Sequence, residues 1–157
     1  MALYLVRHAH AGSRKAWKGD DLKRPLDDRG RRQAKGLLSV VPDDLALVMS
    51  SPALRCVETV QALADRAGVA VETDDGLYEE ARPEPIAKRL RHRLGEHPGH
   101  AVVACSHGDL IPDLLERWAA KGADLDIDQR YAKGSTWVLE AGRKGQIVGG
   151  AYVPPTD

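Results

Sequence analysis

The sequence predicts an α/β protein, a three-layer α/β/α sandwich built around a mainly parallel sheet. Three observations support this prediction. Short apolar runs alternate along the chain with segments whose apolar residues recur at helical spacing. Some of these runs are continuously apolar, which is typical of strands buried on both faces. Proline and glycine separate the segments, and such an alternation predicts a parallel sheet covered by helices.

Size and composition favour one enzyme-sized domain over residues 1–157, since 43% of the 157 residues are apolar and can build a core. Lys plus Arg and Asp plus Glu both number 23, which argues against general binding to nucleic-acid polymers or anionic membranes. No apolar run approaches the roughly 20 residues of a membrane span. The first residues resemble a strand rather than a signal peptide, so a cytoplasmic location is expected.

The chain is expected to begin with a strand, a loop and a helix. Residues 2–7 form an apolar run, whereas residues 11–26 are polar and contain turn formers, which indicates a loop. Residues 27–41 place their apolar side chains on one face, which predicts a helix. Asp27 or Asp28 is suited to cap the start of this helix.

The middle of the chain predicts a strand, a helix and a further strand. Residues 45–50 form the first strand. Pro52 suits the first turn of a helix, which runs to about Arg66 and ends at Gly68. Residues 69–73 alternate between apolar and polar side chains, which indicates a strand.

The second half predicts two helices and three strands. A helix is expected over residues 84–96, followed by a near-continuous apolar strand at 101–106. The next helix covers residues 109–120, whose apolar side chains share one side. Residues 135–140 and 146–153 flank a glycine-rich turn and are expected to form a hairpin.

Three of the expected strands end in polar residues that suit an anion site. Arg7 and His8 end the first strand, Arg55 lies just beyond the second, and His107 follows the strand at 101–106. Ligands of open α/β sheets bind beyond the carboxyl ends of the strands. These four side chains are therefore expected to share one pocket.

This set of side chains suits phosphoryl transfer. The guanidinium groups of Arg7 and Arg55 can bind phosphate oxygens in pairs. His8 can attack phosphorus through a ring nitrogen and form a phosphohistidine, and His107 can donate a hydrogen bond to the same oxygens. Backbone N–H groups near Gly108 can add donors at the start of a helix.

Such a reaction also needs a carboxylic acid that protonates the leaving group and activates water. Glu79 and Glu80 are the candidates, and the residues alone do not separate them. The loop of residues 10–24 is expected to border the pocket, with His10 and Ser13 as candidate substrate contacts. Its basic residues could accept a second phosphate or an acidic protein surface.

These motifs resemble the histidine phosphatase superfamily, also called the phosphoglycerate-mutase-like family, over nearly the whole chain. The matching segments are Arg7-His8 (with Ala9 where the family has glycine), Ser51, Pro52, Arg55 and Thr59, Ser106-His107-Gly108, and Leu77-Tyr78-Glu79. The small size and Arg24-Pro25-Leu26 resemble the SixA-like phosphohistidine phosphatase branch. The chain is still more similar to the phosphatase-like domain attached to some actinobacterial Nudix hydrolases. Because no Nudix signature occurs in this sequence, we expect a free-standing version.

The resemblance implies a phosphoglycerate-mutase-like fold and a phosphatase without cofactor or metal. Its substrate would be a phosphorylated small molecule or a phosphohistidine protein. The implied roles are His8 as nucleophile, Arg7, Arg55 and His107 as phosphate pocket, and Glu79 as acid and base. Arg24 is implied as a substrate contact, with a structural salt bridge to Asp20 or Asp21 as an equal alternative.

Three other functions remain open. A mutase of this superfamily is less favoured, because 157 residues leave little room for the insertions that exclude water. A metallohydrolase could use His8-x-His10 with His107-x-Asp109, but Arg7 would lie beside the cation. A non-catalytic module could hold phosphorylated ligands in the same pocket.

Overall fold

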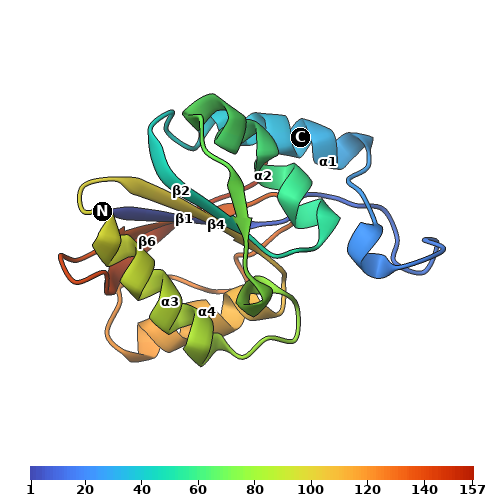
Figure 1. Ribbon diagram of the computed structural model, residues 1–157. Helices are drawn as coiled ribbons and strands as arrows, with labels where there is room; N and C mark the ends of the chain where they lie inside the picture. Colours follow the sequence, from blue (N-terminus) through green and yellow to red (C-terminus); the bar gives the residue numbers. More distant parts are fainter.

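A six-stranded sheet lies between two pairs of helices in the computed structural model, which describes residues 1–157 (Figure 1). The strands are β1 (Ala2–Arg7), β2 (Leu45–Ser50), β3 (Val71–Thr73), β4 (Ala101–Ser106), β5 (Thr136–Ala141) and β6 (Ile147–Val153). The helices are α1 (Asp28–Gly36), α2 (Leu54–Ala67), α3 (Pro83–Glu96) and α4 (Leu110–Ala120). Short 3-10 helices lie at Asp21–Lys23, Leu37–Ser39 and Asp75–Leu77.

The strand order is β3-β2-β4-β1-β5-β6. The first four of these strands pair in parallel, whereas β5 is antiparallel to β1 and β6 is antiparallel to β5. The predicted mainly parallel sheet and the final hairpin are both confirmed. In the parallel register Arg7 faces Ser106, so the residues that follow β1 and β4 lie next to each other at one edge.

Helices cover both faces of the sheet, with α1 and α2 on one side and α3 and α4 on the other (Figure 1). Alternate residues of the central strands point to opposite faces. Leu3 and Leu5 of β1 join the core under α3 and α4, whereas Val6 joins the core under α2. The continuous apolar runs therefore reflect burial on both faces, as predicted. None of the helices is long and apolar enough to cross a bilayer.

Some predicted boundaries are wrong by a few residues. The helix expected over residues 27–41 ends at Gly36 and continues as a 3-10 turn. Pro52 precedes α2, which begins at Leu54. The strand expected from residue 69 begins only at Val71, because the Val69 N–H still bonds to the C-terminal end of α2. Gly68, with φ of 71°, makes this helix end possible.

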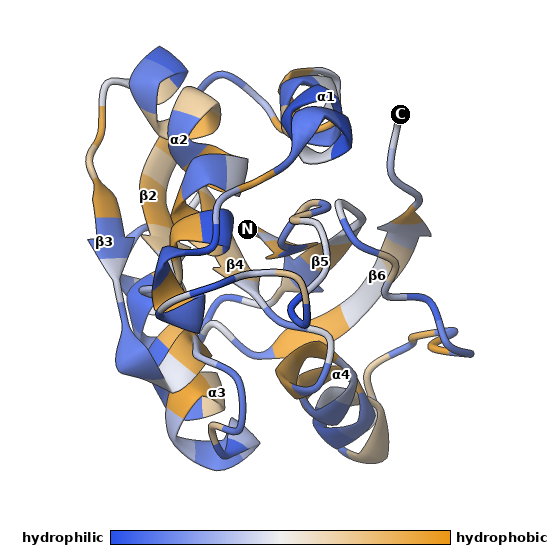
Figure 2. Cartoon of the chain, turned by 90° about the vertical axis from the view of Figure 1, so that its right-hand side faces the viewer, coloured by the Kyte–Doolittle hydropathy of each residue, from blue (hydrophilic) through white to orange (hydrophobic).

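Helix α1 holds the segment that follows β1. It is mostly hydrophilic (Figure 2), and its buried residues are Gly30, Gln33 and Ala34. Asp27 caps the helix by accepting a hydrogen bond from the Gly30 N–H at 2.8 Å. A Cβ atom on Gly30 would overlap the carbonyl oxygen of His10. The absence of a side chain at Gly30 therefore lets α1 pack directly against the backbone beside the strand edge.

We expect Gly30→Ala to destabilise the protein by about 1–3 kcal/mol, because the added methyl group must displace the backbone of His10. Gly95→Ala in α3 is the matched control, since no atom lies within 4 Å of a Cβ built there. The control should be neutral or gain up to about 1 kcal/mol from helix propensity. Urea unfolding measures both changes, and equal effects of the two substitutions would contradict this account.

Candidate active site

A polar pocket of about 400 Å³ opens at the carboxyl ends of β1 and β4, and no hydrophobic residue lines it. Its lining comes from the segments after these two strands and from three loops. The lining residues are Arg7, His8, Gly12, Arg14, Arg24, Glu79, Glu80, His107, Gly108, Asp109 and Lys133.

His8 lies in this pocket with only 6% of its surface exposed. Its Nδ1 atom is 2.8 Å from the carbonyl oxygen of Ala9. A carbonyl only accepts hydrogen bonds, so we assign the proton to Nδ1 and the free lone pair to Nε2. Burial lowers the pKa of His8 to about 3, and the neighbouring His107, Arg55 and Arg7 act in the same direction. The ring is therefore neutral near pH 7 and can act as a nucleophile.

His107 lies beside His8, with 5.3 Å between the ring centroids and 64° between the ring planes. Its Nε2 atom is 2.8 Å from the Ser51 hydroxyl oxygen. That hydroxyl accepts a hydrogen bond from the Ala53 N–H, so its own hydrogen can point to Nε2. The Nδ1 atom then carries a hydrogen, and this buried donor has no partner within the protein.

Two arginines complete the base of the site. The Arg55 side chain is fully buried. Its Nη1 atom donates to the backbone oxygen of Asp21 at 2.9 Å, and Nη2 lies 3.2 Å from the Asp21 carboxylate and 3.5 Å from that of Glu79. Arg7 donates through Nη1 to the carbonyl oxygen of Tyr131 at 2.9 Å. Each guanidinium is thus held in place by part of its hydrogen-bonding capacity.

Several donor atoms of the site make no hydrogen bond within the protein although they are buried. They are Arg7 Nε, Arg55 Nε, Arg55 Nη2 and His107 Nδ1. Buried polar groups almost always have partners, so donors grouped around His8 fit an anion with several oxygens. Gly108 permits this grouping, because a Cβ atom there would lie 2.5 Å from Arg7 Cζ.

Both candidate carboxylates line the pocket. The carboxylate of Glu79 accepts from Arg14 Nη2 at 2.7 and 3.0 Å and lies 3.5 Å from Arg55. Glu80 has a positive φ of 67°, and its N–H donates to the Asp109 carboxylate at 2.6 Å. Glu79 is thus the residue tied to the cations of the site, whereas the Glu80 backbone is tied to the start of α4.

Comparisons with known proteins identify the family of this chain. Residues 3–84 match the Histidine phosphatase superfamily (branch 1). The chain belongs to the histidine phosphatase superfamily. Membership in this superfamily supports phosphatase activity.

A curated relative of this histidine phosphatase chain is an 8-oxo-(d)GTP phosphatase from Mycolicibacterium smegmatis, which is 37% identical over 156 residues. The match covers 98% of this chain but 48% of the relative, so the chain spans about half the length of that protein.

Two solved structures share the fold. The protein histidine phosphatase SixA complexed with tungstate is 19% identical, with a TM-score of 0.73 over 99% of this chain and 96% of that one. A putative phosphohistidine phosphatase SixA from Agrobacterium tumefaciens is 25% identical, with a TM-score of 0.67 over 88% and 91%. The predicted superfamily and its SixA-like similarity are confirmed.

Within this histidine phosphatase chain, the predicted substrate-binding residues divide into two groups. Gly108 and Arg24 line the pocket. Arg24 is 6% exposed and donates to the Asp21 carboxylate at 3.0 Å and to the carbonyl oxygen of Ala11 at 2.7 Å. The structural salt bridge weighed for Arg24 is therefore present, and it fixes the loop that borders the pocket.

The other group, His10 and Ser13, lies outside the pocket lining. The His10 ring contacts the carboxylate of Asp27, which also accepts from the Gly12 N–H at 3.0 Å. The N-cap of α1 therefore holds the His10 ring outside the pocket lining, whereas Gly12 of the same segment still lines the pocket. Burial acts to raise the pKa of Asp27, but hydrogen bonds from Gly30, His10 and Gly12 outweigh it and lower the pKa. Ser13 is exposed on the loop beyond.

Sequence reasoning gave no role to Lys133, which lines the pocket, and considered Asp109, which also lines it, only as a metal ligand or helix cap. Lys133 precedes β5, and the signal that could have found it is a basic residue just before the strand that pairs with β1. Burial lowers the pKa of Lys133, and the nearby Arg7 and Arg24 lower it further. Asp109 accepts from the N–H groups of Leu110 and Glu80.

The residues considered for a metal site do not assemble. No group of three or more His, Cys, Asp or Glu side chains is placed to hold a metal ion. His10 turns to Asp27, and Asp109 caps α4. The two remaining histidines, His8 and His107, lie among guanidinium groups, whose positive charge would oppose a bound cation.

The buried, neutral state of His8 predicts how stability depends on pH. Between pH 6.5 and about 3 the unfolded chain binds a proton at this ring but the folded chain does not. Stability therefore falls as the pH falls through this range, by at most about 1.4 kcal/mol per pH unit from this group.

We expect His8→Gln to flatten the pH dependence of the unfolding free energy between pH 6.5 and about 3. Urea unfolding at several pH values measures this dependence. His92→Gln is the control, because the His92 side chain is 76% exposed. A slope unchanged in His8→Gln, or flattened equally in the control, would show that His8 titrates normally.

Proposed function

We propose that this histidine phosphatase chain hydrolyses a phosphomonoester or a phosphohistidine through a phosphohistidine intermediate on His8. One observation carries the proposal. Four buried N–H donor atoms on Arg7, Arg55 and His107 make no hydrogen bond within the protein, although one of them forms ion pairs, and they surround a histidine that is neutral near pH 7. A dianionic phosphoryl group supplies the acceptors that these donors need.

In the first step Nε2 of His8 forms a bond to phosphorus while the bond from phosphorus to the leaving atom breaks. This atom is the ester oxygen of a phosphomonoester or the ring nitrogen of a phosphohistidine. It keeps the electron pair of the broken bond and takes a proton from the Glu79 carboxyl. Arg7, Arg55 and His107 donate to the phosphoryl oxygens as negative charge builds on them. These donors are already in place, so the transition state requires little reorganisation.

In the second step the Glu79 carboxylate takes a proton from water, and the water oxygen attacks phosphorus. The bond from phosphorus to nitrogen breaks, its electron pair returns to Nε2 of His8, and inorganic phosphate leaves. Glu79 is protonated again, so the cycle closes. The cations of the site are arginine side chains, so we propose that no metal ion takes part.

The substrate class follows from the cations beyond the phosphate pocket. Lys133 lines the pocket and forms no ion pair with an acidic side chain, and Arg14 lies on its exposed rim. Both can contact a second phosphate of the substrate. The curated relative acts on a nucleoside triphosphate by its name. We therefore extend the proposed substrates to the phosphoanhydride of a nucleoside di- or triphosphate, and we favour it over a phosphohistidine protein.

The direct test is phosphate release by wild type and His8→Ala, with and without EDTA. The panel holds phosphohistidine protein, nucleoside di- and triphosphates, sugar phosphates and p-nitrophenyl phosphate. We expect turnover that resists EDTA and falls about a thousandfold or more in His8→Ala, because the nucleophile is lost. Quenching wild type in alkaline denaturant, in which phosphohistidine is stable, should trap a phosphoryl group on His8.

Three results would contradict the mechanism. Turnover that survives His8→Ala excludes His8 as nucleophile, and turnover abolished by EDTA requires a metal ion. If no substrate turns over but inorganic phosphate binds, the site serves as a binding module.

Exchanging each carboxylate for an amide separates the roles of Glu79 and Glu80. For an alkyl phosphate, whose leaving group needs a proton, Glu79→Gln should lower kcat/KM by about 10²–10⁴. For p-nitrophenyl phosphate the loss should stay below about tenfold, because that leaving group departs as an anion. Glu80→Gln is the matched control, and a larger effect there would transfer the acid–base role to Glu80.

A further inference from the structure

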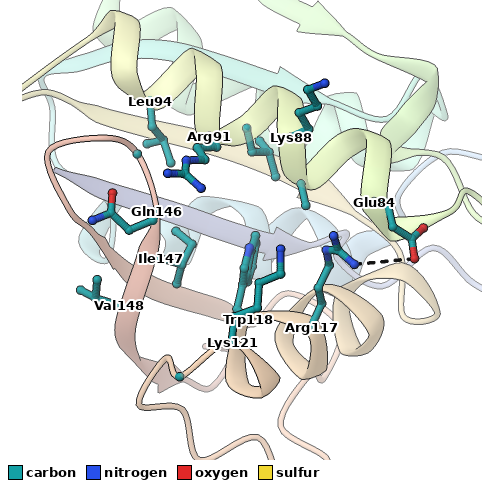
Figure 3. Close-up of a pocket in the computed structure, with 14 residues that line it drawn as sticks. Glu84, Lys88, Arg91, Leu94, Arg117, Trp118, Lys121, Gln146, Ile147 and Val148 are labelled. Atoms are coloured by element: carbon teal, nitrogen blue, oxygen red, sulfur yellow. Dashed lines mark ion pairs between the residues drawn. The ribbon is translucent and has the colours of Figure 1, made fainter.

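A large cavity lies apart from the catalytic pocket, between α3, the C-terminal part of α4 and the start of β6 (Figure 3). Its volume is about 720 Å³, and it shares no lining residue with the catalytic pocket. Sites for small molecules commonly measure about 300–1,000 Å³. We call this cavity the α3–α4–β6 groove.

The floor of the groove is apolar. Leu90 and Leu94 of α3 and Trp118 of α4 line it, and all three are buried members of the hydrophobic core under these helices. Ile147 packs against the same core, and Val148 lies at the edge with 46% of its surface exposed. Leu90, Leu94 and Trp118 expose 8% or less of their surface. An apolar ligand would therefore gain most of its contact area from the more exposed Ile147 and Val148.

The walls of the groove are cationic. Arg91, Arg117 and Lys121 extend into the space between the two helices and the hairpin (Figure 3). Neither Arg91 nor Lys121 forms an ion pair, and Arg91 Nε instead donates to the carbonyl oxygen of Lys144 at 3.2 Å. Glu84 is the one acidic residue of the lining and lies 3.8 Å from Arg117. A net positive charge thus faces the cavity.

One end of the groove is closed by tight backbone packing. The turn between β5 and β6 lies against α3 so closely that a Cβ atom on Gly145 would overlap the carbonyl oxygen of Arg91. Gly145 has φ of 80°, which favours glycine. Together with the bond from Arg91 to Lys144, this packing fixes the hairpin and the helix as walls of one cavity.

We propose that the α3–α4–β6 groove binds a small amphipathic anion, with an apolar body on Trp118, Ile147 and Val148 and a carboxylate or phosphate beside Arg91 and Lys121. The apolar floor disfavours a ligand that is polar throughout, because its polar groups would lose water without gaining partners. The unpaired cations disfavour a neutral ligand relative to an anion.

This ligand is distinct from the reacting phosphate. Helix α4 has 11 residues, with Asp109 at its N-cap beside the catalytic pocket and Lys121 at its C-cap on the groove. At 1.5 Å per residue its two ends lie about 16 Å apart. Both sites can therefore be occupied at once.

The probe is 1-anilinonaphthalene-8-sulfonate, which joins an aromatic body to one anionic group. Its fluorescence on titration into wild type should show saturable binding to one site. Inorganic phosphate, at the lowest concentration that saturates the catalytic pocket, should leave this binding unchanged, because phosphate has no apolar body to hold it in the groove. The neutral analogue N-phenyl-1-naphthylamine should bind about tenfold more weakly or worse, because it lacks the charge-assisted contact. Displacement by phosphate, or equal affinity of the two probes, would overturn the proposal.

Charge reversal tests the walls. Arg91→Glu with Lys121→Glu should weaken the anionic probe about tenfold or more, while catalytic phosphate release stays at the wild-type rate. Arg32→Glu with Lys35→Glu on α1, the opposite side of the sheet, is the matched control and should bind the probe as wild type does. Thermal unfolding confirms that both variants are folded. Weakening of equal size in the control, or none in the groove variant, would overturn the proposal.

A substitution on the floor gives a test that leaves the charges intact. Val148→Ser should weaken both probes by a similar factor, since both rely on apolar contact there. Unchanged binding of both probes would place them elsewhere.

Sedimentation of wild type and of the charge-reversed groove variant tests a different occupant. If wild type is a dimer and the variant is a monomer, a second copy of the chain covers the groove, and the small-ligand proposal is overturned.

Discussion

Arg55 carries a permanent positive charge at a position where none of its side chain meets solvent. A buried charge is tolerated only when opposite charges and hydrogen bonds surround it. Asp21 and Glu79 provide these partners from two loops that are far apart in the sequence. Arg14, in the same loop as Asp21, forms ion pairs with both carboxylates, so cations and carboxylates alternate across the mouth of the pocket. The shape of the site thus depends on how one buried guanidinium is neutralised.

The pairing of β1 with β4 adds the second constraint. Because Arg7 faces Ser106 in this register, the next residue of each segment brings a histidine to the same edge. Burial of His8 is the main reason why its pKa is low, and the neighbouring cations lower it further. The same buried, cationic surroundings therefore suit an anion and keep the ring unprotonated.

Much of this arrangement could be predicted from the sequence, because it follows from local patterns. Apolar runs indicate strands, parallel strands share an edge, and Arg7, His8, Arg55 and His107 come just after strands. The positions of His10 and Ser13 could not be predicted this way, since they depend on where Asp27 lies after folding. Glu79 meets Arg14 across 65 positions of sequence separation. The groove between α3, α4 and β6 likewise arises only from tertiary packing.

The contact between Arg14 and Glu79 differs from the rest of the network in its exposure to water. The Arg14 side chain is 58% exposed, so salt screens this pair far more than it screens the buried partners of Arg55. An anion that reaches the pocket competes with Glu79 for the same guanidinium. By thermodynamic linkage, whatever loosens Glu79 from Arg14 strengthens anion binding, and the bound anion in turn frees the carboxylate. Glu79 therefore stays paired with Arg14 until an anion binds, and the ionic strength of the solution determines how strong this ion pair is.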